Sequence, residues 1–194
     1  MDRREGVTLA RALLLAGLAL FVAAMAALVI ASLGRRRVAT HALSPAEALQ
    51  PADDTMRTVT LDVRDARAWR FVDLAAGRSS TSVTPAGSWD VAVRRHEIRV
   101  GRAAADLGAV PFDAVRRAPG QGWVETRPAG DTTNRALRTW YRYDYSSHVL
   151  ESREHVYVVR DAGGGYVKLQ VAGYYCPGPE AGCLTLRYAR VSPP

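Results

Sequence analysis

An uncharged run of 22 residues, Ala12 to Leu33, is the feature that most restricts how this chain can fold. A helix of that length rises about 1.5 Å per residue and extends ~33 Å, which matches the hydrocarbon thickness of a bilayer. The run is followed by a much longer segment of mixed polarity. We therefore expect one membrane-spanning helix and, after it, a separate folded domain.

The alternative interpretation of this run is a cleaved signal peptide. Such a peptide has an apolar core of about 7–15 residues and a small-residue cleavage site shortly after it. Here Arg35, Arg36 and Arg37 follow a longer run directly, which favours an uncleaved anchor. Arginines flank both ends of the run, so the positive-inside rule does not decide its orientation.

The run divides the chain into four expected parts. Residues 1–11 form a short tail, residues 12–33 the transmembrane anchor, residues 34–57 a tether, and residues 58–194 the folded domain.

Within the tether, Ser44, Pro45 and Glu47 have the pattern of a capping box that starts a short helix. Pro51 would end that helix after about a turn and a half. His41 lies in the same tether, where we expect it to be solvated. The pattern predicts a spacer and no further role.

The net charge of +7 is concentrated around the apolar run. The first 37 residues carry six arginines against two acidic residues, as lipid head groups favour. The remaining residues carry nearly balanced charge, with 20 basic and 17 acidic side chains. The basic excess therefore does not indicate nucleic-acid binding.

From Thr58 onward the hydrophobic period is two, as Val59, Leu61 and Val63 alternate with polar residues. The glycines of Asp161–Gly165 predict a hairpin turn. Short sequential strands joined by such turns are typical of an all-β, mostly antiparallel domain. The other expected strands cover residues 69–74, 89–100, 140–145, 155–160, 166–175 and 184–191.

The two cysteines, Cys176 and Cys183, enclose a short loop rich in proline and glycine. Two strands meeting across this loop would bring the thiols together, so we expect a disulfide, with two free thiols as the alternative. Disulfides persist outside the cytoplasm. We therefore expect a single-pass protein of the cell membrane whose β domain is extracytoplasmic, in the cell envelope or periplasm.

Seven segments in this order and spacing carry a family resemblance: Thr58–Asp62, Trp69–Leu74, Trp89–Arg95, Trp140–Tyr143, Val156–Arg160, Tyr166–Tyr175 and Leu184–Tyr188. Together, over roughly residues 58–190, they resemble the HmuY-type haem-binding proteins of bacterial surfaces. The resemblance implies an all-β, mostly antiparallel domain that is exposed on the cell. It also implies capture of haem through two axial side chains, without catalysis.

By this resemblance, one haem ligand follows the strand at Trp140–Tyr143, and the matching positions here are Tyr145 and His148. We expect His148 to bind the iron through a neutral imidazole, with Tyr145 as its companion. The other family ligand lies on a preceding hairpin, yet residues 122–139 contain neither histidine nor methionine.

His96 and His155 are the remaining histidines that a fold can bring opposite His148. His96 shares its strand parity with Ile98 and Val100, and this predicts a partly buried structural histidine. His155 opens the next strand.

Two functions stay open at this point. The first is a membrane-anchored protein that captures haem or a porphyrin, taken up free or from a haem-carrying protein. The second is the same domain without haem, acting as an interaction module of an envelope assembly, which the missing second ligand favours. Either function involves the membrane and no nucleic acid.

Enzymatic activity is not expected. Asp144, Ser146, Ser147 and His148 are the residue types of a hydrolytic triad, but sequence neighbours on one loop rarely adopt its geometry. The chain also lacks a Gly-x-Ser-x-Gly nucleophile elbow.

Overall fold

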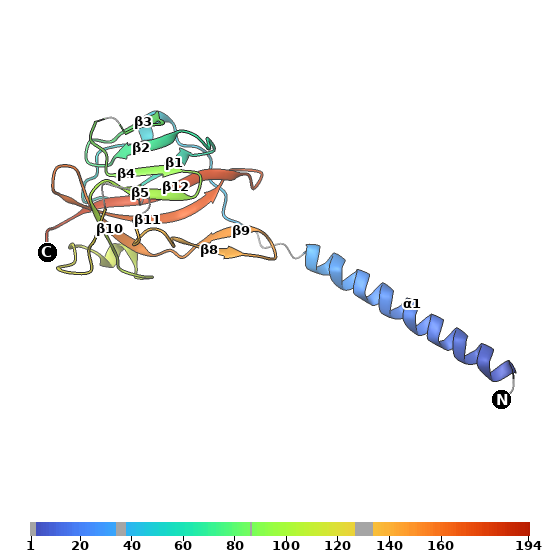
Figure 1. Ribbon diagram of the computed structural model, residues 1–194. Helices are drawn as coiled ribbons and strands as arrows, with labels where there is room; N and C mark the ends of the chain where they lie inside the picture. Colours follow the sequence, from blue (N-terminus) through green and yellow to red (C-terminus); the bar gives the residue numbers. More distant parts are fainter. Residues whose placement is uncertain (1–2, 34–37, 86, 127–133) are drawn as a thin grey trace. The chain divides into compact units, whose positions relative to one another are not determined.

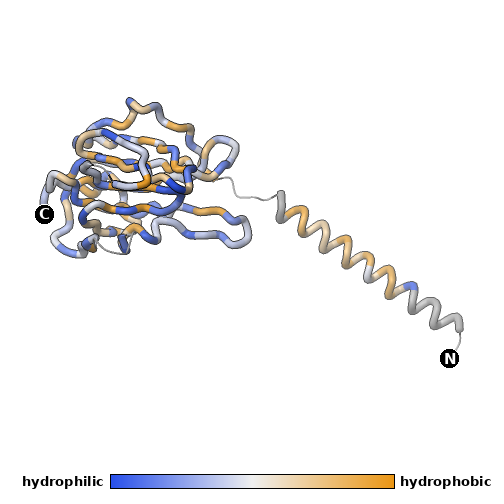
Figure 2. Tube along the Cα trace, turned by 45° about the horizontal axis from the view of Figure 1, so that its top comes forward, coloured by the Kyte–Doolittle hydropathy of each residue, from blue (hydrophilic) through white to orange (hydrophobic). Residues whose placement is uncertain are grey.

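The computed structural model describes residues 3–33, 38–85, 87–126 and 134–194. The chain divides into two compact units, Met1–Arg37 and Val38–Pro194. The first unit contains one helix, α1 (Arg3–Leu33), which is drawn in Figure 1. Within it, Arg11–Ile30 is long and apolar enough to cross a membrane, and Figure 2 shows this apolar stretch along the helix. The arginines at 35–37 lie outside the described residues.

The second unit is built on a six-stranded antiparallel sheet with the strand order β1-β12-β11-β10-β6-β7. Its strands are β1 (Arg57–Asp62), β12 (Ala181–Val191), β11 (Tyr166–Tyr175), β10 (Val156–Arg160), β6 (Ala103–Asp106) and β7 (Val124–Glu125). The two longest strands, β11 and β12, are neighbours near its centre (Figure 1).

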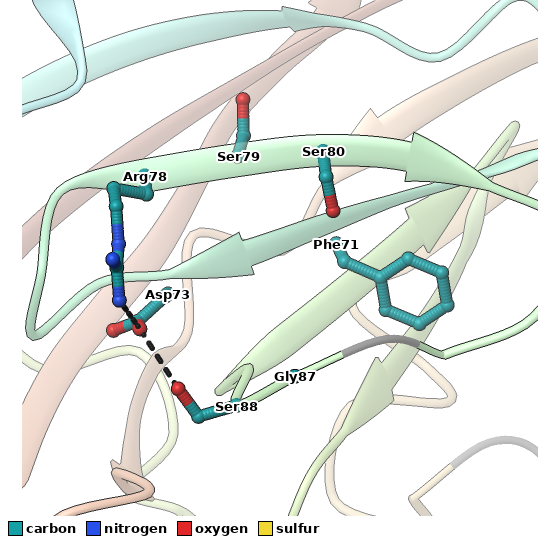
Figure 3. Close-up of a pocket in the computed structure, with 7 residues that line it drawn as sticks. All are labelled: Phe71, Asp73, Arg78, Ser79, Ser80, Gly87 and Ser88. Atoms are coloured by element: carbon teal, nitrogen blue, oxygen red, sulfur yellow. Dashed lines mark hydrogen bonds and ion pairs between the residues drawn. The ribbon is translucent and has the colours of Figure 1, made fainter.

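A second, four-stranded antiparallel sheet has the order β3-β2-β4-β5. In its first turn Asp73 forms an ion pair with Arg78 (Figure 3). A separate two-stranded hairpin pairs β8 with β9. These strands are β3 (Arg78–Ser82), β2 (Trp69–Asp73), β4 (Val91–Arg94), β5 (Glu97–Val100), β8 (Tyr141–Asp144) and β9 (Val149–Ser152). The expectation of a mostly antiparallel all-β fold with one N-terminal helix is thus confirmed.

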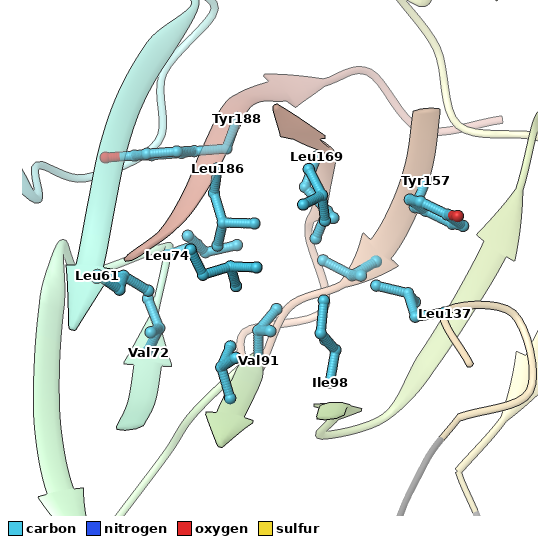
Figure 4. Close-up of a cluster of buried hydrophobic side chains, with 14 of the residues drawn as sticks. Leu61, Val72, Leu74, Val91, Ile98, Leu137, Tyr157, Leu169, Leu186 and Tyr188 are labelled. Carbon is cyan, nitrogen blue, oxygen red and sulfur yellow. The ribbon is translucent and has the colours of Figure 1, made fainter. Parts of the chain in front are cut away.

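The main hydrophobic core lies between the two larger sheets. Alternate residues of the six-stranded sheet, such as Leu169 and Leu186, meet Val72, Val91 and Ile98 of the four-stranded sheet (Figure 4). All five side chains are at most 2% exposed. Burying each of them stabilises the fold by roughly 1.5–3 kcal/mol.

The opposite face of the six-stranded sheet carries a second, smaller core. The 3₁₀ helix η2 (Phe112–Ala114) belongs to the segment that covers this face. From this segment Phe112 and Val115 pack against Val158 of β10 and Val191 of β12. This layer places one side chain of β11, Lys168, under the covering segment.

The expected strand over residues 89–100 is two strands joined by a tight turn. Arg95, with a φ of 53°, and His96 form the turn between β4 and β5. The residues that face the main core are odd-numbered on β4 (Val91, Val93) and even-numbered on β5 (Ile98), while Ala92 is buried on the other face of the sheet. A single strand cannot present both sets to one face, because side chains alternate with a period of two.

Part of the expected tether is packed onto the β domain. Leu49 and Ala52 are buried in the fold, and the His41 N–H donates to the Tyr175 carbonyl oxygen at 2.8 Å. The imidazole of His41 lies against Gly173 and is half-buried, so the expectation of a solvated histidine is wrong. Residues 34–37 of the tether lie outside the described residues.

The capping box in this segment does not form. The 3₁₀ helix η1 (Ala46–Ala48) has Pro45 at its N-cap and no side-chain cap. Instead the Ser44 hydroxyl accepts a hydrogen bond from the Thr60 N–H of β1 at 2.9 Å, and the Ser44 N–H donates to the Thr60 carbonyl at 3.0 Å. Ser44 thereby satisfies open backbone groups at the edge of the sheet, where an unpaired strand is a liability.

Where β11 ends and β12 begins, Cys176 and Cys183 form a disulfide, with their Cα atoms 4.9 Å apart. The bond closes the hairpin that these two strands make. The disulfide expected from the short loop is therefore present.

Candidate functional site

The hairpin of β8 and β9 contains both residues that the sequence nominates as ligands, and its base is firmly held. Trp140, directly before β8, is 1% exposed and donates its indole N–H to the His96 carbonyl oxygen at 2.9 Å. On β9, the Leu150 N–H donates to the Tyr175 hydroxyl at 2.8 Å, and the Ser152 hydroxyl donates to the Val171 carbonyl. Both acceptors belong to β11, so the central sheet positions the hairpin.

The tip of the hairpin is closed by Asp144. One carboxylate oxygen accepts hydrogen bonds from the Ser146 hydroxyl at 2.7 Å, the Ser146 N–H at 2.9 Å and the Ser147 N–H at 3.4 Å. The Ser146 hydroxyl, followed by these backbone donors, lowers the pKa of the Asp144 carboxyl to about 2. The ionised carboxylate therefore shapes the four-residue loop between β8 and β9.

His148 ends that loop with a φ of 57°, and its imidazole turns back onto β8. Its Nδ1 lies 2.6 Å from the Tyr143 hydroxyl. When Nδ1–H donates to that hydroxyl, Nε2 carries the free lone pair, which is the tautomer that a metal ligand needs.

Tyr145 lies beside this pair. The residue is 84% exposed, and its ring stands edge-on to the Tyr143 ring, with 4.9 Å between the centroids. The fold thus brings Tyr145 and His148 together around Tyr143, a residue that the sequence analysis did not nominate. The tyrosine alternation along this strand is the signal that identifies Tyr143, because residues two apart share a face.

His96 is not the partly buried strand residue that its parity predicts. It lies exposed in the β4–β5 turn, with its ring 5.6 Å from the Tyr141 ring in an edge-on arrangement. Tyr141 is the first residue of β8. His96 therefore neighbours the base of the hairpin, and His148 lies at its tip.

His155 has a partner of its own on the six-stranded sheet. Its Nδ1 lies 3.0 Å from both carboxylate oxygens of Asp106, the last residue of β6. This pair holds the imidazole next to the start of β10.

The residue types of a triad do not form a relay among the described residues. Asp144 is bonded to Ser146, whereas His148 is bonded to Tyr143. A relay requires the acid to orient the histidine and the histidine to face the serine.

The second unit has three pockets among its described residues, and neither Tyr145 nor His148 lines any of these three. One of about 330 Å³ lies over β2 and β3, where Asp73 accepts hydrogen bonds from Arg78 and Ser88 (Figure 3). The largest has about 680 Å³ and contains Lys168. Within the described residues, no group of three or more His, Cys, Asp or Glu side chains is arranged to hold a metal ion.

The family model described as HmuY protein matches residues 65–188 of this chain. A comparison with curated proteins returned no match.

Solved structures share the fold. A candidate HmuY-like heme binding protein from Bacteroides vulgatus is 20% identical, with a TM-score of 0.58, over 75% of this chain and 94% of that one. A candidate lipoprotein from Bacteroides fragilis is 17% identical, with a TM-score of 0.60, over 70% of this chain and 89% of that one. The apo HmuY analog of Tannerella forsythia is 18% identical, with a TM-score of 0.57, over 69% of this chain and 94% of that one.

Proposed function

The chain belongs to the HmuY family, and from this premise we propose that its β domain captures haem or a related porphyrin at the tip of the β8–β9 hairpin. The observation that carries the proposal is the 2.6 Å contact between His148 Nδ1 and the Tyr143 hydroxyl. The proteins of this family are binding proteins rather than known enzymes. Capture without catalysis is therefore the activity that the proposal assigns.

The donor groups at the tip fit haem iron. A neutral imidazole is a common axial ligand, and with Nδ1 of His148 bonded to the Tyr143 hydroxyl, Nε2 would be the nitrogen that binds the iron. A tyrosine oxygen also serves as a haem ligand in some proteins. In this proposal the exposed Tyr145 is the candidate second ligand, which would bind the iron through its hydroxyl oxygen.

We place the β domain outside the cytoplasm, with residues 12–33 as a single-pass anchor in the cell membrane and residues 1–11 as a short tail. The length and apolarity of α1 support the anchor. The disulfide between Cys176 and Cys183 supports an oxidising compartment.

A hemin titration of the full chain in detergent micelles tests the proposal, with the Soret region recorded against protein-free micelles. The expected result is a saturable, red-shifted band. His148→Ala weakens binding by about tenfold or more, because it removes the iron–imidazole bond. Tyr143→Phe weakens it less, because Nδ1 loses its partner while Nε2 stays in place.

His155→Ala is the matched comparison, since this imidazole is held by Asp106 and not by the hairpin. The proposal expects hemin affinity to be unchanged in this variant. Loss of the band in His155→Ala with retention in His148→Ala would move the site to β10 and overturn the assignment.

A second candidate function is docking of a protein partner in an envelope assembly, without haem. The observation that favours it is the exposure of Tyr145 and His148 outside the three pockets. A flat difference spectrum with folded protein would reject haem capture. Cross-linking from a photoreactive residue at position 145 would then identify the partner.

A further inference from the structure

The largest of the three pockets encloses an unusual side chain. Lys168 is the chain's single lysine, although the sequence has 25 arginines. It lies on β11 and is only 7% exposed. Its ammonium group donates to the carbonyl oxygens of Phe112 and Val115, each at 2.8 Å, and lies 4.3 Å from the centre of the Phe112 ring.

These contacts suit a lysine better than an arginine. An ammonium is a compact point charge, whereas a guanidinium is a planar fork that needs more room and a flat partner. The space between the two carbonyls of the η2 segment suits the ammonium. An ammonium has three N–H donors, so two carbonyls leave one for another acceptor.

Among the described residues, no carboxylate that lines the pocket forms an ion pair with Lys168. Arg116 and Arg190 are cationic lining residues, and Asp54 and Asp113 are acidic ones. Arg190 is already engaged, since it donates to the Ala52 carbonyl at 3.2 Å and to Asp161 at 3.4 Å. Burial lowers the pKa of Lys168, and the charge of Asp113 opposes that shift.

The pocket in Figure 3 shows the contrast. In that pocket Asp73 is the single acidic lining residue, and it accepts hydrogen bonds from Arg78 and Ser88. The charged and polar side chains of that pocket are therefore bonded to one another. In the Lys168 pocket the described contacts of the buried ammonium are two neutral carbonyls and the Phe112 ring, and these leave one N–H donor for a further acceptor.

We propose that the pocket between the η2 segment and the end of β12 binds the carboxylate of a small organic acid, with Lys168 and Arg116 as its anchors. The apolar lining residues Val115, Val191 and Pro193 would contact the carbon chain of the acid. Asp54 and Asp113 leave the lining with a small net positive charge, which suits a singly charged carboxylate better than a doubly charged phosphate. A volume of about 680 Å³ is in the range of small-molecule sites.

The single lysine makes this site directly observable. Selective ¹⁵N-lysine labelling of the full chain in detergent micelles gives one backbone amide signal, that of Lys168. Titration with butyrate should move this signal saturably, with millimolar affinity. Titration with inorganic phosphate at the same ionic strength should move it less.

Arg116→Ala tests the second anchor and keeps the two carbonyl contacts of Lys168, which do not involve the exposed Arg116 side chain. It should weaken butyrate binding by about threefold or more, as expected for an exposed ion pair. Arg117→Ala is the matched control: it removes the neighbouring exposed arginine, which does not line the pocket, and should leave the affinity unchanged. A lysine signal that does not respond to butyrate, or equal effects of the two substitutions, would overturn the proposal.

Discussion

Trp140 and Tyr145 lie five residues apart in the sequence and at opposite extremes of burial. The Trp140 side chain is 1% exposed, and the Tyr145 side chain is 84% exposed. Trp140 lies at the base of the β8–β9 hairpin, which is hydrogen-bonded to the β4–β5 turn and to β11. Tyr145 lies at the tip, which is held by hydrogen bonds within its own loop. One short hairpin therefore contains both scaffold and candidate site.

The difference shows how the fold separates stability from binding. At the base, large side chains fill the core, and neighbouring elements accept and donate the hydrogen bonds. At the tip, Asp144 and Tyr143 organise the loop and the imidazole within the hairpin itself. We expect substitutions at the base to change the free energy of unfolding and substitutions at the tip to change binding.

The largest expected effect is that of Trp140→Ala. Removing this buried ring leaves a cavity between Tyr141 and Tyr174 and deprives the His96 carbonyl of its donor. Such substitutions lower the free energy of unfolding by about 3–5 kcal/mol. Urea denaturation monitored by circular dichroism measures the change.

Tyr145→Ala is the matched substitution at the tip and should change the free energy of unfolding by at most about 0.5 kcal/mol. A similar loss of stability in both variants would break the distinction between base and tip.

A smaller effect is expected of Tyr175→Phe, which joins the two regions. It removes the hydroxyl that accepts the Leu150 N–H and keeps the buried ring. The free energy of unfolding should fall by about 1 kcal/mol, and the Leu150 amide should exchange its hydrogen faster than in the unmodified protein.

Tyr174→Phe is the comparison variant. It removes the hydroxyl of the neighbouring tyrosine, whose ring packs against Trp140, but the Leu150 N–H is bonded to Tyr175 and not to Tyr174. It should leave the exchange rate of the Leu150 amide unchanged. Equal acceleration in the two variants would show that the hydroxyl of Tyr175 does not hold the hairpin.

The smallest effect concerns pH at the tip. The folded loop lowers the pKa of Asp144 from 3.8 to about 2, chiefly through the Ser146 hydroxyl. A lowered acid pKa stabilises the loop above pH 3.8, and this contribution is lost as the pH falls through about 2. A carbon-detected NMR titration of the Asp144 carboxyl should have its midpoint in that low range.

Ser146→Ala should raise the Asp144 midpoint toward the ordinary value while leaving the core signals unchanged, since the contact is confined to the loop. An Asp144 midpoint that does not move in this variant would contradict the assigned cause.

The strands with apolar residues between clear turn signals were predictable. β1 lies where its period of two places it, β2, β10 and β11 lie within about one residue of the expected ranges, and the Asp161–Gly165 turn joins β10 to β11 as expected. The switch from odd to even apolar core positions between Val93 and Ile98 is the sequence signal of the β4–β5 turn, and a single strand over residues 89–100 does not account for it. The alanine-rich β6 gave no strand signal, because alanine has low β propensity, and its pairing with β10 supplies the stability.

The sequence by itself determined the apolar helix, the antiparallel class of the domain, the disulfide hairpin and the family to which the chain belongs, because these depend on local periodicity, turn chemistry and ordered motifs. Only the tertiary structure decided the partners of the polar side chains. Tyr143 meets His148 across a turn, His41 packs on Gly173, and Lys168 lies between two carbonyls of a distant segment. The physical reason is that such contacts depend on the register and on loops that fold back, which no short stretch of sequence specifies.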